Sequence, residues 1–183
     1  FIINGCERVV INQIIRSPGI YYKEEVSKKG ESIYSATLIP SRGSWLKFEI
    51  DRKNNITVSI DKTEKISILK LFTNLDLSIK EILANLTYPD FLNELITKET
   101  QDQKASQDSN AEIQRNFNVR IFNPKYYDIG NIGRYKLNNR FNLNVPKGKG
   151  DLTTQDLLAI VDALITLKYK KKGNLDDIDH LQN

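Results

Sequence analysis

The chain has 183 residues, of which 39% are hydrophobic and 27% charged, and its formal net charge is +4. A chain of this length can bury a core of its own, in one or two domains, and its charge permits a polyanionic partner without requiring one. One cysteine and one histidine exclude an internal disulfide framework and a Cys/His metal cluster, and no apolar run is long enough to span a bilayer.

The first part of the chain, residues 1–60, has the composition of β-structure. β-Branched and aromatic residues recur there between turn signals. We expect five strands, at residues 1–4, 7–15, 33–39, 45–50 and 56–61.

Two arginines stand out in the strand expected at residues 7–15 and just after it. If this strand is unbroken, Arg8, Asn12 and Arg16 have the same parity and project from one face. Such charged and amide groups face either a phosphate-rich ligand or only solvent at the edge of a sheet. A Ser-Pro-Gly sequence at residues 17–19 ends the segment with a tight turn.

Residues 45–61 predict a β-hairpin, because apolar and polar residues alternate on both sides of a polar loop at residues 51–55. The apolar positions share one face: Leu46, Phe48, Ile50, Ile56, Val58 and Ile60. If residue 50 pairs with residue 56, Trp45 lies opposite Asp61 on the other face. The Trp45 ring then either stacks with an unpaired nucleic-acid base, beside a carboxylate that accepts from a base amino group, or packs against another part of the protein.

The apolar residues from about residue 65 onward follow a helical period, so the expected fold class is α+β, with hairpins in the β-rich N-terminal part followed by helices. Residues 65–98 predict two short helices and a third at about 89–97. Residues 98–116 are polar and predict a flexible surface loop or a disordered linker.

Two later stretches also predict helix. Arg134, Lys136 and Arg140 form a basic helical stretch that either lies near nucleic acid or is simply solvated. Thr153 and Asp156 have the spacing of a capping box, and an apolar stripe after them predicts a longer helix. The lysines between residues 168 and 172 complement the dipole of that helix, which explains them more simply than a DNA-binding patch.

Four segments, in the same order along the chain, resemble the second-largest (beta) subunit of bacterial-type and plastid-type multisubunit RNA polymerase. They are FIINGCERVVINQIIRSPG (residues 1–19), LIPSRGSWLKFEID (38–51), YYDIGNIGRYKLN (126–138) and LDDIDHLQN (175–183). Residues 97–120 carry no such motif, although many members have a helical Y-R-x-L-R-P-G segment there. Four collinear motifs make chance similarity a poor explanation.

The resemblance implies a domain organisation. Residues 1–16 correspond to the end of the protrusion domain, residues 17–174 to the lobe, with 98–116 as a flexible loop, and residues 175–183 to the return toward the protrusion. Because the sequence starts at Phe1 and lacks methionine, we expect it to be an internal piece of a longer polypeptide.

The resemblance also implies a nucleic-acid site. In the family, the residues that match Trp45, Asp61 and Asp179 form a pocket for bases of the non-template DNA strand at the downstream edge of the bubble, and arginines that match Arg16 follow that strand. The candidate nucleic-acid-binding residues are Arg16, Arg42, Trp45, Asp61, Lys62, Arg134 and Asp179.

Other family positions carry less specific expectations. Residues that match Arg8, Ile11 and Gln13 border the pocket of rifamycin-type inhibitors. Arg42, in the turn before the hairpin, either contacts a phosphate or is only solvated. Family members hold the catalytic Mg²⁺ on the largest subunit, so we expect neither a catalytic residue nor a metal ligand here, and a structural role for His180.

The expected function is therefore that of part of a DNA-directed RNA polymerase, a nucleotidyltransferase, whose partners are the non-template strand, the downstream duplex, the alpha and beta′ subunits and sigma factor, with no membrane. Cys6, Gln182 and the Lys, Ile and Asn bias resemble plastid members, so we expect the chloroplast stroma, with the bacterial cytoplasm as the alternative. A freestanding single-strand-binding module and a subunit-contact scaffold remain alternative functions.

Overall fold

The structure is a computed structural model, and all structural statements concern the part of the chain that it describes. The described residues are 1–26, 30, 32–60, 65–75, 77–102, 120–146, 148, 150–170 and 175–176, with the side chains of 74 and 98–102 left out.

An antiparallel sheet forms the base of the molecule. Within the described residues it has five strands in the order β3-β4-β5-β6-β7. Their bounds are Gly19–Val26 (β3), Ser32–Ile39 (β4), Leu46–Ile50 (β5), Ile56–Ile60 (β6) and Ile66–Ser67 (β7). The strands expected at 33–39, 45–50 and 56–61 are thus present, whereas β3 and β7 were not expected.

The hairpin of β5 and β6 has the expected register. Ile50 pairs with Ile56 and Leu46 pairs with Ile60. Asn54 adopts φ 67° in the connecting turn, a left-handed conformation that asparagine tolerates well. All six residues of the expected apolar face are at most 4% exposed, so the alternation in the sequence identified the face that packs on the core.

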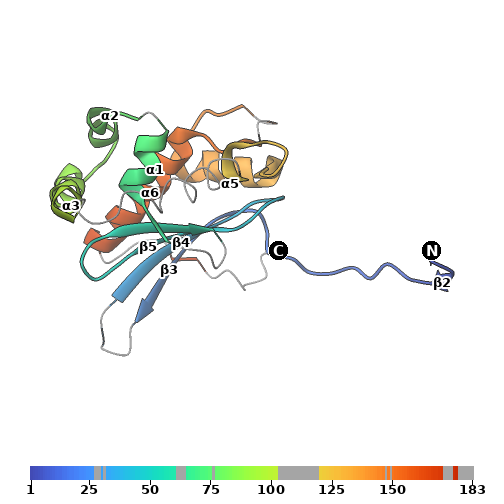
Figure 1. Cartoon of the computed structure of the whole chain (residues 1–183). Coiled ribbons are helices and arrows are strands. Elements are labelled where there is room, and N and C mark those ends of the chain that lie inside the picture. Colours follow the sequence, from blue (N-terminus) through green and yellow to red (C-terminus); the bar gives the residue numbers. More distant parts are fainter. Residues whose placement is uncertain are drawn as a thin grey trace.

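Helices cover one side of the sheet (Figure 1). Their bounds are Ile68–Asn74 (α1), Ile79–Ala84 (α2), Pro89–Asp102 (α3), Gly130–Phe141 (α5) and Thr154–Lys170 (α6). This arrangement confirms the α+β class. None of the described helices is long and apolar enough to cross a membrane.

Helix α6 forms the centre of the helical layer. Its residues Leu157, Ile160, Val161 and Leu164 are at most 1% exposed. The expected capping box is present: the Asp156 carboxylate accepts from the Thr153 backbone N–H at 2.8 Å, and the Thr153 hydroxyl accepts from the Asp156 N–H at 3.3 Å. These bonds satisfy backbone donors that would otherwise be unpaired at the helix start.

The expectation of a loop beginning at residue 98 is wrong for its first five residues. Helix α3 continues to Asp102, because Lys, Glu and Gln have good helix propensity and extending a formed helix is cheap. The rest of the expected loop, residues 103–116, lies outside the described residues.

The strand expected at residues 7–15 is also wrong. Ile2–Ile3 (β1) and Cys6–Glu7 (β2) form a short hairpin through Asn4 and Gly5, both with positive φ. Arg8 closes this hairpin by pairing with Phe1, and residues 9–16 connect it to the sheet as an extended segment outside any strand (Figure 1). Arg8, Asn12 and Arg16 therefore do not share a strand face, since a strand needs a partner for its backbone hydrogen bonds.

Asp176 joins the far end of the described chain to β3. Its backbone N–H donates to the Tyr22 carbonyl at 2.9 Å, and its carboxylate accepts from the Tyr22 N–H at 2.8 Å and from Arg140 at 2.7 Å. The Tyr22 hydroxyl donates to the Ile160 carbonyl of α6 at 3.1 Å, and burial raises the pKa of that hydroxyl. Sheet, helical layer and C-terminal segment are thus linked around one strand.

Candidate nucleic-acid interface

Trp45 lies immediately before β5 and outside the core. It is 37% exposed, whereas Leu46, the next residue, is 1% exposed. The Arg16 guanidinium carbon lies 5.4 Å from the centroid of the Trp45 ring, within the range of a cation–π interaction. An aromatic ring and a cation, from segments 29 positions apart (45 minus 16), therefore meet at the surface.

The loop that carries Trp45, residues 40–45, is fixed by a second segment. Arg42 forms a two-way backbone bridge with Asp128, with N···O distances of 3.0 and 2.9 Å. The Arg42 side chain is exposed and donates to the Pro124 carbonyl at 2.8 Å. Arg42 thus has a structural role in the loop, and the choice between phosphate contact and solvation stays a prediction.

Gly43 explains why the two segments approach so closely. A Cβ atom at this position would lie 2.8 Å from the Tyr127 ring and 2.9 Å from the Tyr126 carbonyl oxygen, and its φ is +118°. Both the space and the conformation therefore favour glycine. The loop under Trp45 is therefore anchored by close backbone contacts in addition to the Arg42 side chain.

Three of the expected site residues, Asp61, Lys62 and Asp179, lie outside the described residues. The register of β5 and β6 is described as far as the pair Leu46–Ile60. The expected neighbourhood of Trp45 and Asp61 stays a prediction.

Arg134 does not lie on a basic surface, so the expectation for this residue is wrong. Its side chain and that of Asp156 are both 0% exposed, and the guanidinium donates to the Asp156 carboxylate at 2.7 Å and to the Asp151 carbonyl. A guanidinium enclosed with its counter-ion cannot reach a phosphate in solvent. Arg134 instead connects α5 to the capping box of α6.

The other two basic residues of α5 are also used inside the protein. Lys136 donates to the Ser17 hydroxyl at 3.0 Å, and its ammonium lies 5.7 Å from the Tyr21 ring. Arg140 binds Asp176 and lies 4.6 Å from the Tyr22 ring centroid. The basic stretch therefore attaches α5 to β3, a role for which its spacing alone gave no signal.

Comparison with known proteins identifies the family. A family model described as RNA polymerase Rpb2, domain 2, matches residues 16–183. The chain belongs to the RNA polymerase Rpb2 domain 2 family. The resemblance found in the four sequence motifs is thereby confirmed.

Curated relatives of this Rpb2 domain 2 chain are similar over its whole length. It is 47% identical to the DNA-directed RNA polymerase subunit beta of Trichormus variabilis over 196 residues, which cover 100% of this chain and 18% of the relative. The proteins of the same name in Mesostigma viride and Pyropia yezoensis are 45% and 44% identical, with the same coverage. The chain thus spans less than a fifth of the length of these relatives.

The residues expected to border an inhibitor pocket lie at the exposed start of this Rpb2 domain 2 chain. The Arg8 backbone closes the first hairpin, with an N–H bond of 2.7 Å to the Phe1 carbonyl. Ile11 is 78% exposed, and Gln13 is exposed as well. The structure describes these residues but provides no test of an inhibitor role.

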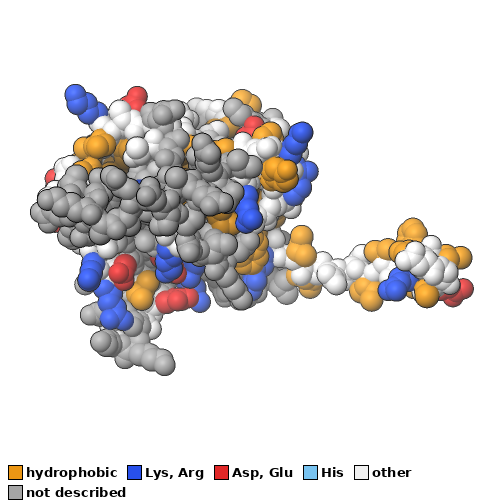
Figure 2. Space-filling model, in the orientation of Figure 1, with side chains coloured by type: hydrophobic (Ala, Val, Ile, Leu, Met, Phe, Trp, Pro, Cys, Tyr) orange, Lys and Arg blue, Asp and Glu red, His pale blue; other side chains and the backbone are white. Residues whose placement is uncertain are grey.

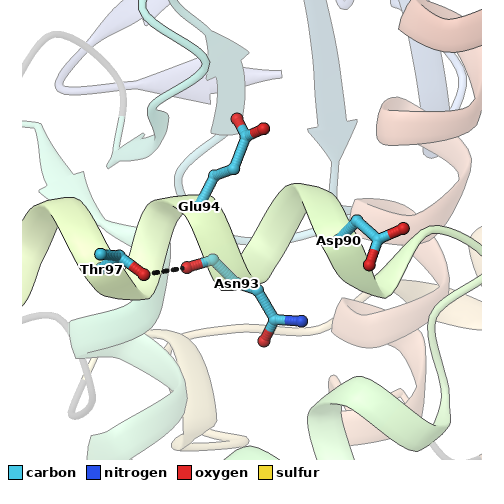
Figure 3. A pocket seen from close by; sticks show the side chains of 4 residues that line it. All are labelled: Asp90, Asn93, Glu94 and Thr97. Atoms are coloured by element: carbon cyan, nitrogen blue, oxygen red, sulfur yellow. Dashed lines mark hydrogen bonds between the residues drawn. The ribbon is translucent and has the colours of Figure 1, made fainter.

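A surface hollow of about 420 Å³ lies beside α3 (Figure 3). It is lined by Asp90, Asn93, Glu94 and Thr97, all from one helix face, and the Thr97 hydroxyl donates to the Asn93 carbonyl at 2.8 Å. The opposite face of α3 is buried through Phe91, Leu92 and Leu95. The hollow is therefore the solvated side of an amphipathic helix.

Sequence reasoning missed one group that the geometry brings to this interface. Lys125 and Tyr126 are exposed on the turn that supports the Trp45 loop. The signal was present in the Asn-Pro-Lys-Tyr-Tyr sequence, which combines turn residues with adjacent aromatic residues. Across the described residues, no group of three or more His, Cys, Asp or Glu side chains could hold a metal ion.

Proposed function

We propose that this chain is the lobe part of an RNA polymerase beta subunit, that it lines the downstream DNA channel, and that it holds the non-template strand. Family membership and the names of the relatives support the assignment to RNA polymerase. In the complete enzyme, Mg²⁺ ions on the largest subunit would support phosphoryl transfer between nucleotides. The role of this chain in that reaction is to position DNA.

The observation that carries the proposal is the exposed Trp45 ring next to Arg16. A base stacked on an aromatic ring gains about 1–3 kcal/mol, and a neighbouring guanidinium attracts the phosphate that follows it. Trp45 is more than a third exposed although tryptophan is usually well buried. An exposed ring on an anchored loop is suited to a ligand that arrives from solvent.

The proposed site also includes three residues that are assigned on the family resemblance alone, Asp61, Lys62 and Asp179. A carboxylate near the Trp45 ring would accept a hydrogen bond from a base amino group, which gives some choice among bases. A lysine beside it would contact the backbone phosphate without reading sequence. Arg42 is a further candidate phosphate contact.

The proposal is tested with polymerase that contains a Trp45→Ala beta subunit, with Trp45→Phe as the matched control. Loss of stacking predicts an open-complex lifetime at least about fivefold shorter for the alanine variant, a smaller change for phenylalanine, and an unchanged rate of phosphodiester bond formation. An alanine variant whose lifetime still responds to the non-template base as before would contradict the proposal.

A second candidate function is a contact between polymerase subunits or domains. It is favoured by the extension formed by residues 1–16, on whose outer end orange apolar side chains gather in Figure 2. Val9, Val10, Ile11, Ile14 and Ile15 are 71–87% exposed. An apolar surface of this kind marks an interaction site, and the rest of the beta subunit or the alpha, beta′ and sigma subunits would cover it.

We further propose that the polymerase acts in the plastid, with a bacterial cytoplasm as the alternative. The matches to Mesostigma viride and Pyropia yezoensis support the first, and those to Trichormus variabilis and Trichodesmium erythraeum leave the second open. Sequencing the genome compartment that encodes the chain distinguishes the two.

A further inference from the structure

Two adjacent tyrosines, at the end of the turn at residues 123–126 and just after it, differ sharply in burial. Asn123 organises this turn: its carbonyl accepts from the N–H groups of Tyr126 and Tyr127 at 2.9 and 3.0 Å, and its side chain accepts from the Lys125 N–H at 3.0 Å. Tyr127 is 1% exposed and packs in the core, whereas Tyr126 is 59% exposed. The turn therefore anchors itself through one ring and presents the other to solvent.

The same turn supports the loop that carries Trp45. The Arg42 side chain holds the Pro124 carbonyl, the Arg42 and Asp128 backbones are bridged, and Gly43 lies against the Tyr126 carbonyl. Trp45 follows Gly43 by two residues, so their Cα atoms are at most about 8 Å apart. Tyr126 and Trp45 are thus held on one junction, not on two independently moving loops.

Positive charge lies on this junction as well. Arg16 contacts the Trp45 ring, Arg42 is exposed in the bridge, and Lys125 is exposed next to Tyr126. Exposed aromatic rings interleaved with cations are the elements of single-strand nucleic-acid binding, because rings stack on bases and cations follow the phosphates. Stacked bases rise about 3.4 Å each along a strand, so one strand that touches Trp45 passes the junction within a few nucleotides.

We propose that Tyr126 is a second stacking position for the single DNA strand that Trp45 contacts, and that Lys125 binds a phosphate of the same strand. This inference rests on the proposed function and adds a further site residue and a direction to it. The strand runs from Trp45 across the 40–45 loop toward the 123–126 turn. Tyr126 stacks on a nucleotide different from the one at Trp45.

The test combines side-chain and base removal in assembled polymerase on DNA with a pre-melted bubble. Tyr126→Ala and Trp45→Ala are each measured against a series of non-template strands with one abasic nucleotide, and DNA dissociation rates are compared. Residue and base that stack on one another give non-additive losses. We expect coupling of about fivefold or more between Tyr126 and one nucleotide, within a few positions of the nucleotide coupled to Trp45.

Matched variants separate stacking from other effects. Tyr126→Phe keeps the ring and retains the coupling, and Tyr135→Ala, which removes a tyrosine of similar exposure on α5, shows none. Lys125→Ala lowers the slope of log affinity against log salt by about 0.7, the value for one phosphate of a single strand. Lys80→Ala, an exposed lysine on α2, leaves the slope unchanged.

The outcomes distinguish this inference from the proposed function. If Trp45 couples to a nucleotide and Tyr126 to none, the second position is wrong and the proposed function stands. If neither couples, both fail. If Tyr126→Phe loses as much as Tyr126→Ala, the hydroxyl and not the ring carries the contact, and the stacking position is wrong. If a photoreactive residue at 126 attaches only to protein, the exposed ring serves a protein contact, and the stacking position is again wrong.

Discussion

Arg134 and Arg16 show how differently two arginines of this chain are used. Arg134 is enclosed with Asp156, at 0% exposure for both side chains, whereas Arg16 covers a surface tryptophan. A buried ion pair contributes little net stability compared with apolar residues, but a single charge left behind in the core is costly. The two arginines therefore call for different tests.

Removal of one partner of the buried pair should strongly destabilise the protein. Asp156→Ala leaves the Arg134 guanidinium buried without its carboxylate and also opens the capping box of α6, so we expect a loss of about 3–5 kcal/mol in the free energy of unfolding. Urea denaturation measures it. The double variant Arg134→Met, Asp156→Leu should recover a large part of the loss, and a single variant within about 1 kcal/mol of wild type would contradict the account.

Glu49 gives a pH-dependent test at the residue scale. It accepts from Lys47 at 2.6 Å and from Lys65. Partial burial alone would raise the pKa of Glu49, but the hydrogen bonds and charges of the two lysines outweigh it and lower the pKa. A lowered pKa in the folded state stabilises above the ordinary glutamate value of about 4.3 and loses this contribution as pH falls through the folded value.

Glu49→Gln should therefore cost about 1 kcal/mol at pH 7 and almost nothing near pH 3, by urea denaturation at both pH values. Glu25→Gln is the control, because Glu25 and its partner Lys23 are both more than half exposed and such pairs contribute little. An equal cost of Glu49→Gln at both pH values would show that its lysine contacts are not electrostatic.

Individual elements were predictable wherever local pattern and tertiary packing agree. The β5–β6 hairpin follows from strict alternation, and the start of α6 follows from Thr153 and Asp156. The segment at residues 8–16 has equally good β-propensity yet forms no strand, because propensity supplies no pairing partner. β3 was missed since its second half, Lys23 to Val26, is mostly charged and lies at the exposed end of the sheet.

The exposure of Trp45 was predictable from the sequence, whereas the contacts of the cations on α5 were not. Trp45 follows from the alternation that places Leu46 inside. The roles of Arg134, Lys136 and Arg140 depend on which residues α5 meets in the fold, and a count of positive charges does not contain that information. Tyr126 was missed for the same reason, because the loop that its turn contacts lies far away in the sequence.

Gly133 tests how α5 is seated against the Ser-Pro-Gly turn. Alanine has the higher helix propensity by about 1 kcal/mol, but a Cβ at this position would lie 2.4 Å from the Ile129 side chain and 3.2 Å from Pro18 Cβ. We expect crowding to prevail and Gly133→Ala to lose about 1–2 kcal/mol in thermal or urea unfolding. Asn139→Ala, exposed on the same helix, should be neutral or slightly stabilising, and a stabilised Gly133→Ala would mean that α5 does not rest on this turn.

At the scale of the whole molecule, the chain combines a well-packed body with an extension that leaves it (Figure 1). The Trp45 loop is held to the body by one backbone bridge, the Arg42 side chain and the close approach of Gly43. The extension exposes most of its apolar residues. This contrast agrees with the two proposed roles, DNA binding at the Trp45 loop and a protein contact through the extension.

The most direct test of the central claim is photocrosslinking from position 45 in assembled polymerase. A photoreactive aromatic residue replaces Trp45, the complex is formed on DNA with a labelled bubble, and the attached nucleotides are mapped on both strands. The account predicts attachment to non-template bases at the downstream edge of the bubble. Attachment only to the template strand, or only to protein, would contradict it.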